Sequence, residues 1–178
     1  TVFLKIEELA SDFSSDATLA QIRHSIDSRD PFYTQENDFW NEIGPELEEY
    51  TQKLNQSLLE SPFRSEFETE FGKLIFTNTE ISLKCFSPAI IPLLQQENKL
   101  VDEYEVLIAK AKVAFEGKEY TIPQMGPFKT DADDDRRLAA WKAEAGWYKE
   151  NQPALDRIYD EMVHLRAEMG KTLGYGGF

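Results

Sequence analysis

The chain has 178 residues, of which 41% are hydrophobic and 12% aromatic, which is enough for a packed core and excludes a disordered chain. Its 33 acidic and 19 basic residues give a net charge of −14. That charge argues against nucleic acid and anionic membranes as partners, because both are bound through dense Lys and Arg patches, and no apolar run approaches the roughly 18 residues of a membrane span.

The opening segment, TVFLKIEELA, lacks the basic start and the apolar core of a signal peptide. It reads like the second half of a helix, so we expect the visible chain to start inside a longer one. The single cysteine, Cys85, excludes an intrachain disulfide and favours a reducing compartment.

Residues 2–28 show helical periodicity in two stretches. The first runs to Phe13, and Ser14–Asp16 reads as a break or cap before the second, which continues to about Ser28. The predicted apolar positions are Val2, Leu4, Ile6, Leu9 and Phe13 in the first helix and Leu19, Ile22 and Ile26 in the second.

Asp30-Pro31 ends that helix or begins a tight turn, because the residue before a proline is pushed out of the α region. Thr34 is then a candidate cap for a helix that turns Phe39 and Trp40 towards a core. Gly44-Pro45 predicts a kink or a short break. The apolar stripe beyond it consists of Leu47, Tyr50, Leu54 and Leu58.

The serine-proline pair Ser61-Pro62 predicts another helix start. This helix would run to Cys85, and its many aromatic residues indicate a place at the centre of the core. A second pair, Ser87-Pro88, begins the following helix, unless Pro92 marks the true start. The predicted apolar positions are Phe63, Phe67, Phe71, Leu74, Ile75, Ile81 and Cys85 in the first of these helices and Leu100, Tyr104, Leu107, Ile108 and Ala111 in the second.

The hydrophobic period then changes from helical to alternating. Val113 and Phe115 alternate with a small residue, Gly117 supplies a turn, and the pattern predicts a β-hairpin at about residues 112–123. A Pro/Gly loop follows, and helical signals resume with Thr130 or Asp131 as the cap. They continue past a break or bend at Pro153 to Gly170 or Gly174. The apolar positions of this region are Leu138, Trp141, Ala145 and Tyr148, then Leu155, Ile158, Tyr159, Met162, Leu165 and Met169.

The whole pattern predicts a mostly α fold, an antiparallel, bundle-like array of helices with one short β-hairpin. We expect residues 1–178 to form a single helical domain, since no repeat of fixed period and no low-complexity linker divides the chain.

Glu161 and His164 have the i, i+3 spacing found in di-metal carboxylate bundles, which need two such units and two further carboxylates. The only other histidine, His24, has Gln21 three residues before it, so the second unit is missing. We therefore interpret Glu161 and His164 as ordinary helix-face residues.

No other pattern in the sequence predicts a catalytic, cofactor-binding or metal-binding residue. The zinc-peptidase motif HExxH is absent, and two histidines so far apart cannot assemble it. Cys85 lies on a predicted apolar stripe, which indicates a buried structural thiol rather than a nucleophile. Neither GxSxG nor a glycine-rich phosphate loop before a helix is present.

The acidic run Asp131–Asp135 resembles a calcium-binding loop only superficially. It lacks the glycine at the sixth position and the closing glutamate at the twelfth, which is Lys142. Favourable negative charge at a helix N-terminus explains the run better. Tyr33, Trp40 and Trp147 could line a peptide groove, although aromatic residues at helical spacing are usually core.

Five segments carry a resemblance to a known family. Residues 22–33 read IRHSIDSRDPFY, residues 36–45 read ENDFWNEIGP, and residues 58–76 read LLESPFRSEFETEFGKLIF. Residues 87–128 contain SPAIIPLLQQENKLVDEYEVLIAKAKVAF followed by EGKEYTIPQMGPF, and residues 155–178 read LDRIYDEMVHLRAEMGKTLGYGGF. In order and spacing these segments resemble the N-terminal, non-catalytic part of oligoendopeptidase F, one of the thimet-oligopeptidase-like zinc peptidases.

The resemblance implies a mostly helical region that forms part of one wall of a deep, enclosed substrate channel. The parent would be a cytoplasmic zinc metalloendopeptidase that cuts oligopeptides. Its zinc would be held by the two histidines of HExxH and a downstream glutamate, with the glutamate of the motif as general base. None of those positions exists in this chain, so we expect zinc only in the missing catalytic domain. We expect this chain alone neither to bind zinc nor to hydrolyse peptides.

Our leading hypothesis is a scaffold and substrate-channel region whose partners are the parent's catalytic domain and, in the full enzyme, oligopeptide substrates. The alternative is a stand-alone helical interaction module without catalysis, and an unrelated helical adaptor or a metal-carboxylate bundle ranks below both. Exposed apolar surface separates the first two, because a severed region would bare a patch where the catalytic lobe belongs and would self-associate or bind that lobe. The loop Met125–Phe128 is where we expect substrate contact.

Overall fold

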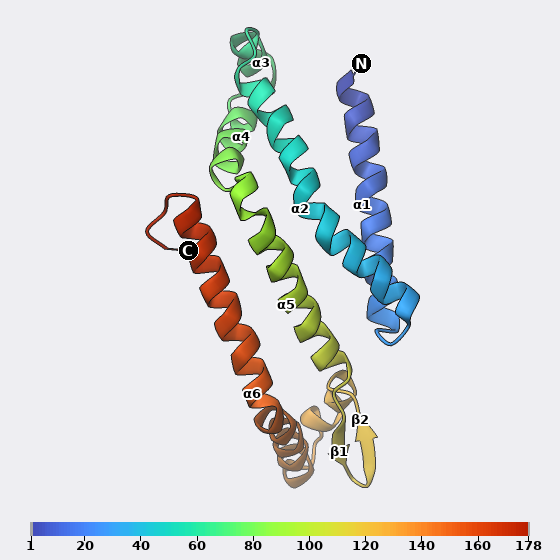
Figure 1. The fold of residues 1–178 in the computed structure, drawn as a ribbon. Coiled ribbons are helices and arrows are strands. Elements are labelled where there is room, and N and C mark those ends of the chain that lie inside the picture. Colours follow the sequence, from blue (N-terminus) through green and yellow to red (C-terminus); the bar gives the residue numbers. More distant parts are fainter. Residues whose placement is uncertain (1, 178) are drawn as a thin grey trace. The chain divides into compact units, whose positions relative to one another are not determined.

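The computed structural model describes residues 2–177, apart from the side chains of residues 2–4 and 7. These residues form six α-helices, three short 3-10 helices and two paired strands (Figure 1). The predicted class, mostly helical with one antiparallel hairpin, is confirmed. The elements are α1 Val2–Ile26, α2 Pro31–Leu59, α3 Arg64–Phe71, α4 Leu74–Lys84, η1 Pro88–Ile90, α5 Ile91–Ala109, β1 Val113–Phe115, β2 Lys118–Tyr120, η2 Pro123–Met125, η3 Phe128–Thr130 and α6 Asp134–Thr172.

The chain divides into two compact units. The first unit comprises residues 1–99 and 163–178, and the second unit comprises residues 100–162. We describe each unit by itself.

Helix α1 of the first unit is continuous, so the predicted break at Ser14–Asp16 is wrong. The hydroxyl of Ser15 donates to the carbonyl of Ser11 (2.8 Å), and that of Thr18 donates to the carbonyl of Ser14 (2.7 Å). Because these hydroxyls are satisfied within the helix, they do not compete with its backbone hydrogen bonds. Of the predicted apolar positions, the side chains of Val2 and Leu4 lie outside the described residues.

Helix α2 begins directly after Asp30, where the sequence predicts the end of the preceding helix or a tight turn rather than a helix start. The Asp30 carboxylate accepts from the backbone N–H groups of Phe32 (2.8 Å) and Tyr33 (3.3 Å), and Pro31 occupies the first turn. Thr34 is already inside the helix, where its hydroxyl donates to the carbonyl of Asp30 (3.0 Å). The prediction of Thr34 as the cap is therefore wrong.

Helix α2 also continues through Pro45, where the sequence predicts a kink or a break. A proline inside a helix leaves the carbonyl four residues earlier without its donor. Here that carbonyl belongs to Asn41, and the side-chain amide of Asn98 in α5 donates to it (2.9 Å). Gln95 in the same helix donates to the next carbonyl, that of Glu42 (2.8 Å). Asn98 of α5 thus supplies the hydrogen-bond donor that Pro45 lacks, and α2 continues without a break.

The single helix predicted between Ser61-Pro62 and Cys85 is two helices, α3 and α4, separated at Gly72. Gly72 has φ +85°, a conformation that costs glycine little and other residues much. The turn changes the helical register, so one apolar stripe cannot pass through both helices. As a result Phe71 and Leu74 are exposed, and the core position is Phe76, which is 1% exposed.

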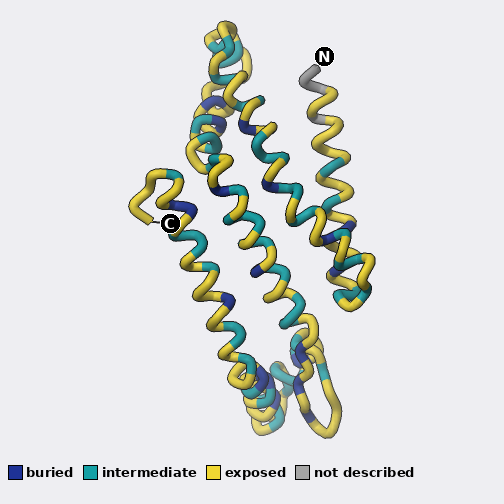
Figure 2. The backbone as a smooth tube through the Cα atoms, in the orientation of Figure 1, coloured by how far each residue is buried: buried dark blue, intermediate teal, exposed yellow. Residues whose placement is uncertain are grey.

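The second unit contains the end of α5, the hairpin and most of α6. Val113 pairs with Tyr120 and Phe115 with Lys118, which confirms the hairpin predicted at about residues 112–123. The turn residues Glu116 and Gly117 both have positive φ, which matches the twist of a two-residue hairpin turn. Buried residues gather at the hairpin and the facing turns of α6 (Figure 2). This core consists of Ala111, Val113, Phe115, Met125, Ala140 and Trp147.

Helix α6 starts later than predicted and passes through Pro153 without ending. Its cap is Asp133, whose carboxylate accepts from the backbone N–H of Arg136 (2.9 Å), so the prediction of Thr130 or Asp131 is wrong. The predicted end at Gly174 is confirmed. Gly174 has φ +87°, and the N–H of Tyr175 donates to the carbonyl of Gly170 (2.8 Å), which closes a Schellman motif.

Candidate functional site

The residues that the sequence singled out for metal chemistry are on helix surfaces. Glu161 accepts a hydrogen bond from Arg157 one turn earlier (3.0 Å), an ordinary i, i+4 ion pair. His164 is exposed on α6 and His24 is buried in α1. Within the described part of the chain, no three or more His, Cys, Asp or Glu side chains are grouped so that they could hold a metal ion.

Cys85 is exposed, and the prediction of a buried thiol is wrong. The apolar stripe that carried this prediction ends early, because α4 stops at Lys84 and Cys85 is its C-cap. A capping residue leaves the helical spiral, so its side chain no longer follows the buried face.

The acidic run Asp131–Asp135 is used at the start of α6. Asp131 accepts from the backbone N–H of Asp133 (2.9 Å), and Asp133 in turn caps the helix. Asp134 pairs with Arg137, whose guanidinium also donates to the carbonyl of Asp131 (2.6 Å). These contacts agree with negative charge at a helix N-terminus and leave no shared cation site.

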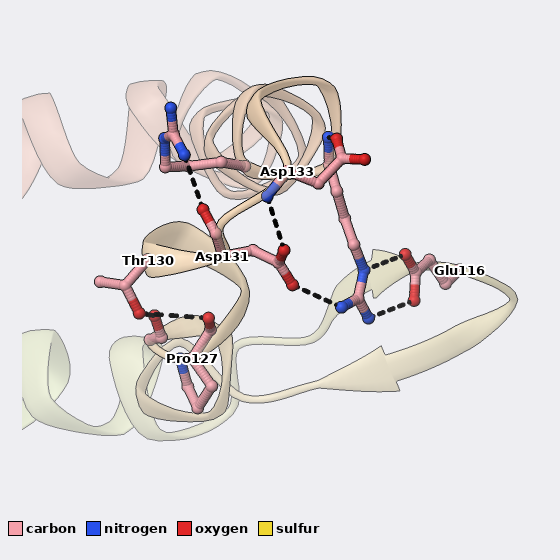
Figure 3. A network of polar contacts seen from close by, with 8 residues as sticks. Glu116, Pro127, Thr130, Asp131 and Asp133 are labelled. Carbon is pink, nitrogen blue, oxygen red and sulfur yellow. Dashed lines mark hydrogen bonds and ion pairs between the residues drawn. The ribbon is translucent and has the colours of Figure 1, made fainter.

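Arg136 joins the hairpin to the start of α6 (Figure 3). Its guanidinium donates to both carboxylate oxygens of Glu116 (2.7 and 2.9 Å), in the fork geometry of a bidentate pair. A third bond reaches Asp131 (2.6 Å), and the guanidinium also lies 5.1 Å from the ring centroid of Phe128. One side chain therefore fixes the hairpin turn, the η3 loop and the α6 cap together.

The electrostatics of this cluster favour the charged forms. The hydrogen bond from Arg136 lowers the pKa of Glu116. The backbone N–H of Asp133 and then Arg136 lower the pKa of Asp131. The two carboxylates in turn raise the pKa of Arg136, so the cluster is fully ionised at neutral pH.

A second, more buried contact anchors the same loop. The ammonium of Lys129 lies 2.8 and 2.7 Å from the two carboxylate oxygens of Glu144, and both side chains are largely buried. The same ammonium lies 4.7 Å from the ring centroid of Trp141, whose indole N–H donates to the carbonyl of Lys129 (3.2 Å). The loop is thus tied to α6 by an ion pair, a cation–π contact and a hydrogen bond.

These anchors decide what the Met125–Phe128 loop presents. Met125 is fully buried in the core of the second unit. Phe128 is half-buried, with ring centroids 5.2 Å from Phe115 and 4.9 Å from Tyr120. The apolar side chains of the loop therefore pack against the hairpin. The expectation of substrate contact there stays a prediction, and it rests on the exposed Pro127 alone.

The three aromatic candidates do not form one groove. Tyr33 and Trp40 belong to the first unit, where Trp40 packs edge-on against Phe13 at a centroid distance of 4.7 Å. Trp147 is buried in the core of the second unit. The usual interpretation of such residues, as core, holds for Trp147.

Several apolar stripes that the sequence assigns to a core are exposed instead. Leu138, Trp141 and Tyr148 lie on the outer face of α6, whereas Ala140 and Trp147 face the hairpin. In the first unit, Ile26 is 77% exposed and Leu74 is 71% exposed. The exposed large apolar residues of the first unit also include Leu9, Leu19, Ile22, Phe32, Phe39, Tyr50, Phe63, Phe71, Ile75 and Ile81.

The total surface supports the same conclusion. The solvent-accessible surface of the chain is 12315 Å², whereas a compact protein of this mass exposes about 8,900 Å². Two separate compact bodies with the masses of the two units would expose about 10,600 Å² together, so the excess does not depend on how the units are placed. The chain therefore exposes more surface than two compact bodies of these masses would, and the exposed apolar residues of both units are part of that surface.

None of the described helices is both long and apolar enough to cross a bilayer.

Comparison with known proteins gives these faces a context. Residues 1–86 match the family described as the peptidase M3 N-terminal domain. An oligoendopeptidase F crystal structure is 41% identical to this chain with a TM-score of 0.90, and the match covers 96% of this chain and 30% of that one. An oligoendopeptidase F structure from Bacillus anthracis str. Ames is 42% identical with a TM-score of 0.89, and the match covers 96% of this chain and 31% of that one.

A third solved structure, PZ peptidase A with an inhibitor, is 41% identical with a TM-score of 0.89, and the match covers 95% of this chain and 30% of that one. Curated proteins give no significant match. The chain spans less than a third of the length of each solved relative. The resemblance found in the sequence is confirmed: residues 1–86 match the peptidase M3 N-terminal domain, and nearly the whole chain matches the N-terminal part of oligoendopeptidase F structures at about 41% identity.

Proposed function

We propose that residues 1–178 act as a non-catalytic scaffold of a cytoplasmic zinc metalloendopeptidase that cleaves oligopeptides. In this role the helices line part of the substrate channel and hold the catalytic domain, which carries HExxH and the zinc. The chain supplies surface and rigidity, and the chemistry belongs to its partner.

One observation carries the proposal. A chain that matches under a third of its solved relatives also exposes long apolar stripes in both of its units. Apolar faces of this extent mark interaction surfaces, and the part of the relatives that this chain does not match is the natural candidate to cover them. The anchored hairpin adds a rigid edge, because Arg136 and Lys129 fix it to α6.

We further propose that the chain alone is inactive and carries no zinc. Peptide hydrolysis by this family, as the resemblance implies, needs two histidines one turn apart and a glutamate beside them. The two histidines here, His24 and His164, are 140 positions apart in sequence. Neither can form such a pair.

The experiment uses the purified chain and full-length B. anthracis oligoendopeptidase F as the positive control. Zinc is measured by mass spectrometry and hydrolysis with a set of quenched-fluorescent oligopeptides. We expect zinc far below one equivalent and no turnover above a mock purification. A matched variant, His24→Ala/His164→Ala, separates the chain from contaminants. Turnover that is present in the wild type and lost in this variant would overturn the proposal.

A further inference from the structure

Helix α6 presents an apolar stripe, interrupted at Gln152, that the core of its own unit does not use. Residues with alternating spacings of three and four form this stripe, which we call the α6 seam. Over about 21 residues the seam is roughly 32 Å long. Its members are Leu138, Trp141, Ala145, Tyr148, Gln152, Leu155 and Tyr159, all exposed except the half-buried Leu155.

Another face of the same helix packs into the core of the second unit. Ala140, Trp147 and Ile158 are buried, and Ala140 and Trp147 pack against the hairpin. These residues are displaced around the helix from the seam by roughly a third of a turn. Leu138 (52% exposed) and Tyr159 (72% exposed) therefore contribute little to the stability of the unit itself.

The spacing of the seam fits another α-helix. Positions that repeat as three and four residues keep an apolar line facing a partner helix, as in coiled coils and bundles. Trp141 is held in place before any partner arrives, by its bond to the carbonyl of Lys129 and by the ammonium above its ring. Tyr148 is held edge-on by Trp147, at a centroid distance of 5.1 Å. Side chains already ordered lose less entropy on binding.

The border of the seam specifies the charge of that partner. Lys142 and Lys149 lie seven residues, or about two turns, apart beside Trp141, Ala145 and Tyr148, and both are exposed. Neither forms an ion pair with another residue in the described part of the chain, whereas Arg136, Arg137 and Arg157 all do. The next border position, Asp156, accepts a hydrogen bond from Gln152 (3.2 Å). Two unpaired lysines in a chain of net charge −14 are complementary to carboxylates on a partner.

Resting on the proposed function, we propose that the α6 seam docks an amphipathic helix of the catalytic portion of an oligoendopeptidase F-type peptidase. That helix would carry apolar residues at matching three- and four-residue spacing and Asp or Glu opposite Lys142 and Lys149. A second copy of this chain fits less well. Two copies repel each other through their net charge, and antiparallel seams would place lysine borders against each other.

The test uses the full chain and, as the probe, the portion of B. anthracis oligoendopeptidase F beyond the matched region, co-expressed with the chain or purified. Zinc content verifies that the probe is folded. Binding is measured by calorimetry and light scattering for three proteins: the wild type, a seam variant and a control variant. The seam variant is Lys142→Glu/Lys149→Glu, and the control is Lys110→Glu/Lys118→Glu, which makes the same change of net charge at exposed sites outside the seam.

We expect the seam variant to bind about tenfold more weakly or worse, because two favourable border pairs become repulsive, and the control to stay within about twofold. Leu138→Gln/Tyr159→Gln should weaken binding similarly while its circular dichroism stays native. A benzophenone amino acid at Ala145 should crosslink to the probe, and one at Glu150, on the other exposed face, should not.

The outcomes separate the two proposals. If the wild type binds the folded probe but the seam variants bind equally well, the seam inference is overturned and the proposed function stands. If the wild type does not bind the folded probe, the proposed function itself fails. If instead the seam variants abolish dimerisation of the chain alone, a second copy is the occupant and the seam inference is wrong.

Discussion

The sharpest test of the second unit is the substitution Met125→Ala. Met125 is fully buried between the hairpin and α6, and in the sequence it belongs to a loop that we expect to contact substrate. If it is a core residue, truncation leaves a cavity and costs about 2–5 kcal/mol. A unit of about 60 residues has a free energy of unfolding of roughly 3–9 kcal/mol, so the loss would be a large part of its stability.

The matched control is Met162→Ala, which makes the same chemical change in the same unit at a half-buried position. It should cost about 1 kcal/mol, because less apolar surface leaves contact. With a shift of about 4–8 °C per kcal/mol for a unit of this size, a loss of about 2–5 kcal/mol in Met125→Ala should lower the melting temperature of the second unit by about 8–40 °C.

The assay should resolve the two units, since a chain with two compact units need not unfold in one step. Hydrogen exchange of peptides from the hairpin and from residues 134–162 reports the second unit. Peptides from α1 and α2 serve as the internal reference. Equal destabilisation by the two substitutions would refute the reasoning and would return Met125 to the surface as a contact residue.

Three further predictions follow from particular contacts. Gly117→Ala should destabilise the hairpin by about 1–2 kcal/mol in a thermal melt, because Gly117 has φ +76°. Gly146→Ala in α6 should be neutral or stabilising in the same melt, because an added Cβ meets nothing within 4 Å there. The reverse order of stabilities would contradict the turn geometry. The carboxylates of Glu116 and Asp131 have a lower pKa in the folded state than their ordinary values of 4.5 and 3.8. Their contribution to the free energy of unfolding is therefore complete above those ordinary values and is lost as the pH falls through the folded pKa values. The urea midpoint should drop more between pH 7 and 3 for the wild type than for Arg136→Gln. Parallel plots of urea midpoint against pH would refute a stabilising role of the Arg136 contacts. Cys85 should react with Ellman's reagent in the native chain nearly as fast as in urea, and strong protection would mean that the thiol is buried after all.

The sequence predicted well those features that depend on a few adjacent residues. The hairpin follows from alternation on both sides of Gly117, and the end of α6 follows from Gly174. In each case the determining contacts lie within one turn of chain, so local rules contain the necessary information.

Helix interruptions were predicted less well because they depend on distant residues. Pro45 removes a hydrogen bond from Asn41, and only the fold reveals that Asn98, more than fifty residues later, supplies a replacement. Gly72 was the opposite case, since a lone glycine within an apolar stretch gave too weak a signal for the turn between α3 and α4. The Arg136 cluster also has no periodic signature, because its partners are 20 and 5 residues away.

Periodicity identified apolar helix faces correctly but could not tell which of them pack within the chain. On α6, Leu138, Trp141 and Tyr148 have the stronger pattern, yet the smaller Ala140 faces the hairpin. A stripe that serves a partner and a stripe that serves the chain's own core look alike in sequence. The exposure of the more strongly apolar face of α6 is the observation behind the proposed partner helix.

The most direct measurement of this account is the rate of peptide cleavage on reconstitution. The zinc-loaded catalytic portion of the B. anthracis relative is assayed with quenched-fluorescent oligopeptides, with and without an excess of this chain. If residues 1–178 complete the substrate channel, cleavage should rise with added chain and saturate, while the chain alone stays inactive. A rate that is unchanged at saturating chain, with the catalytic portion shown to be folded, would contradict the account.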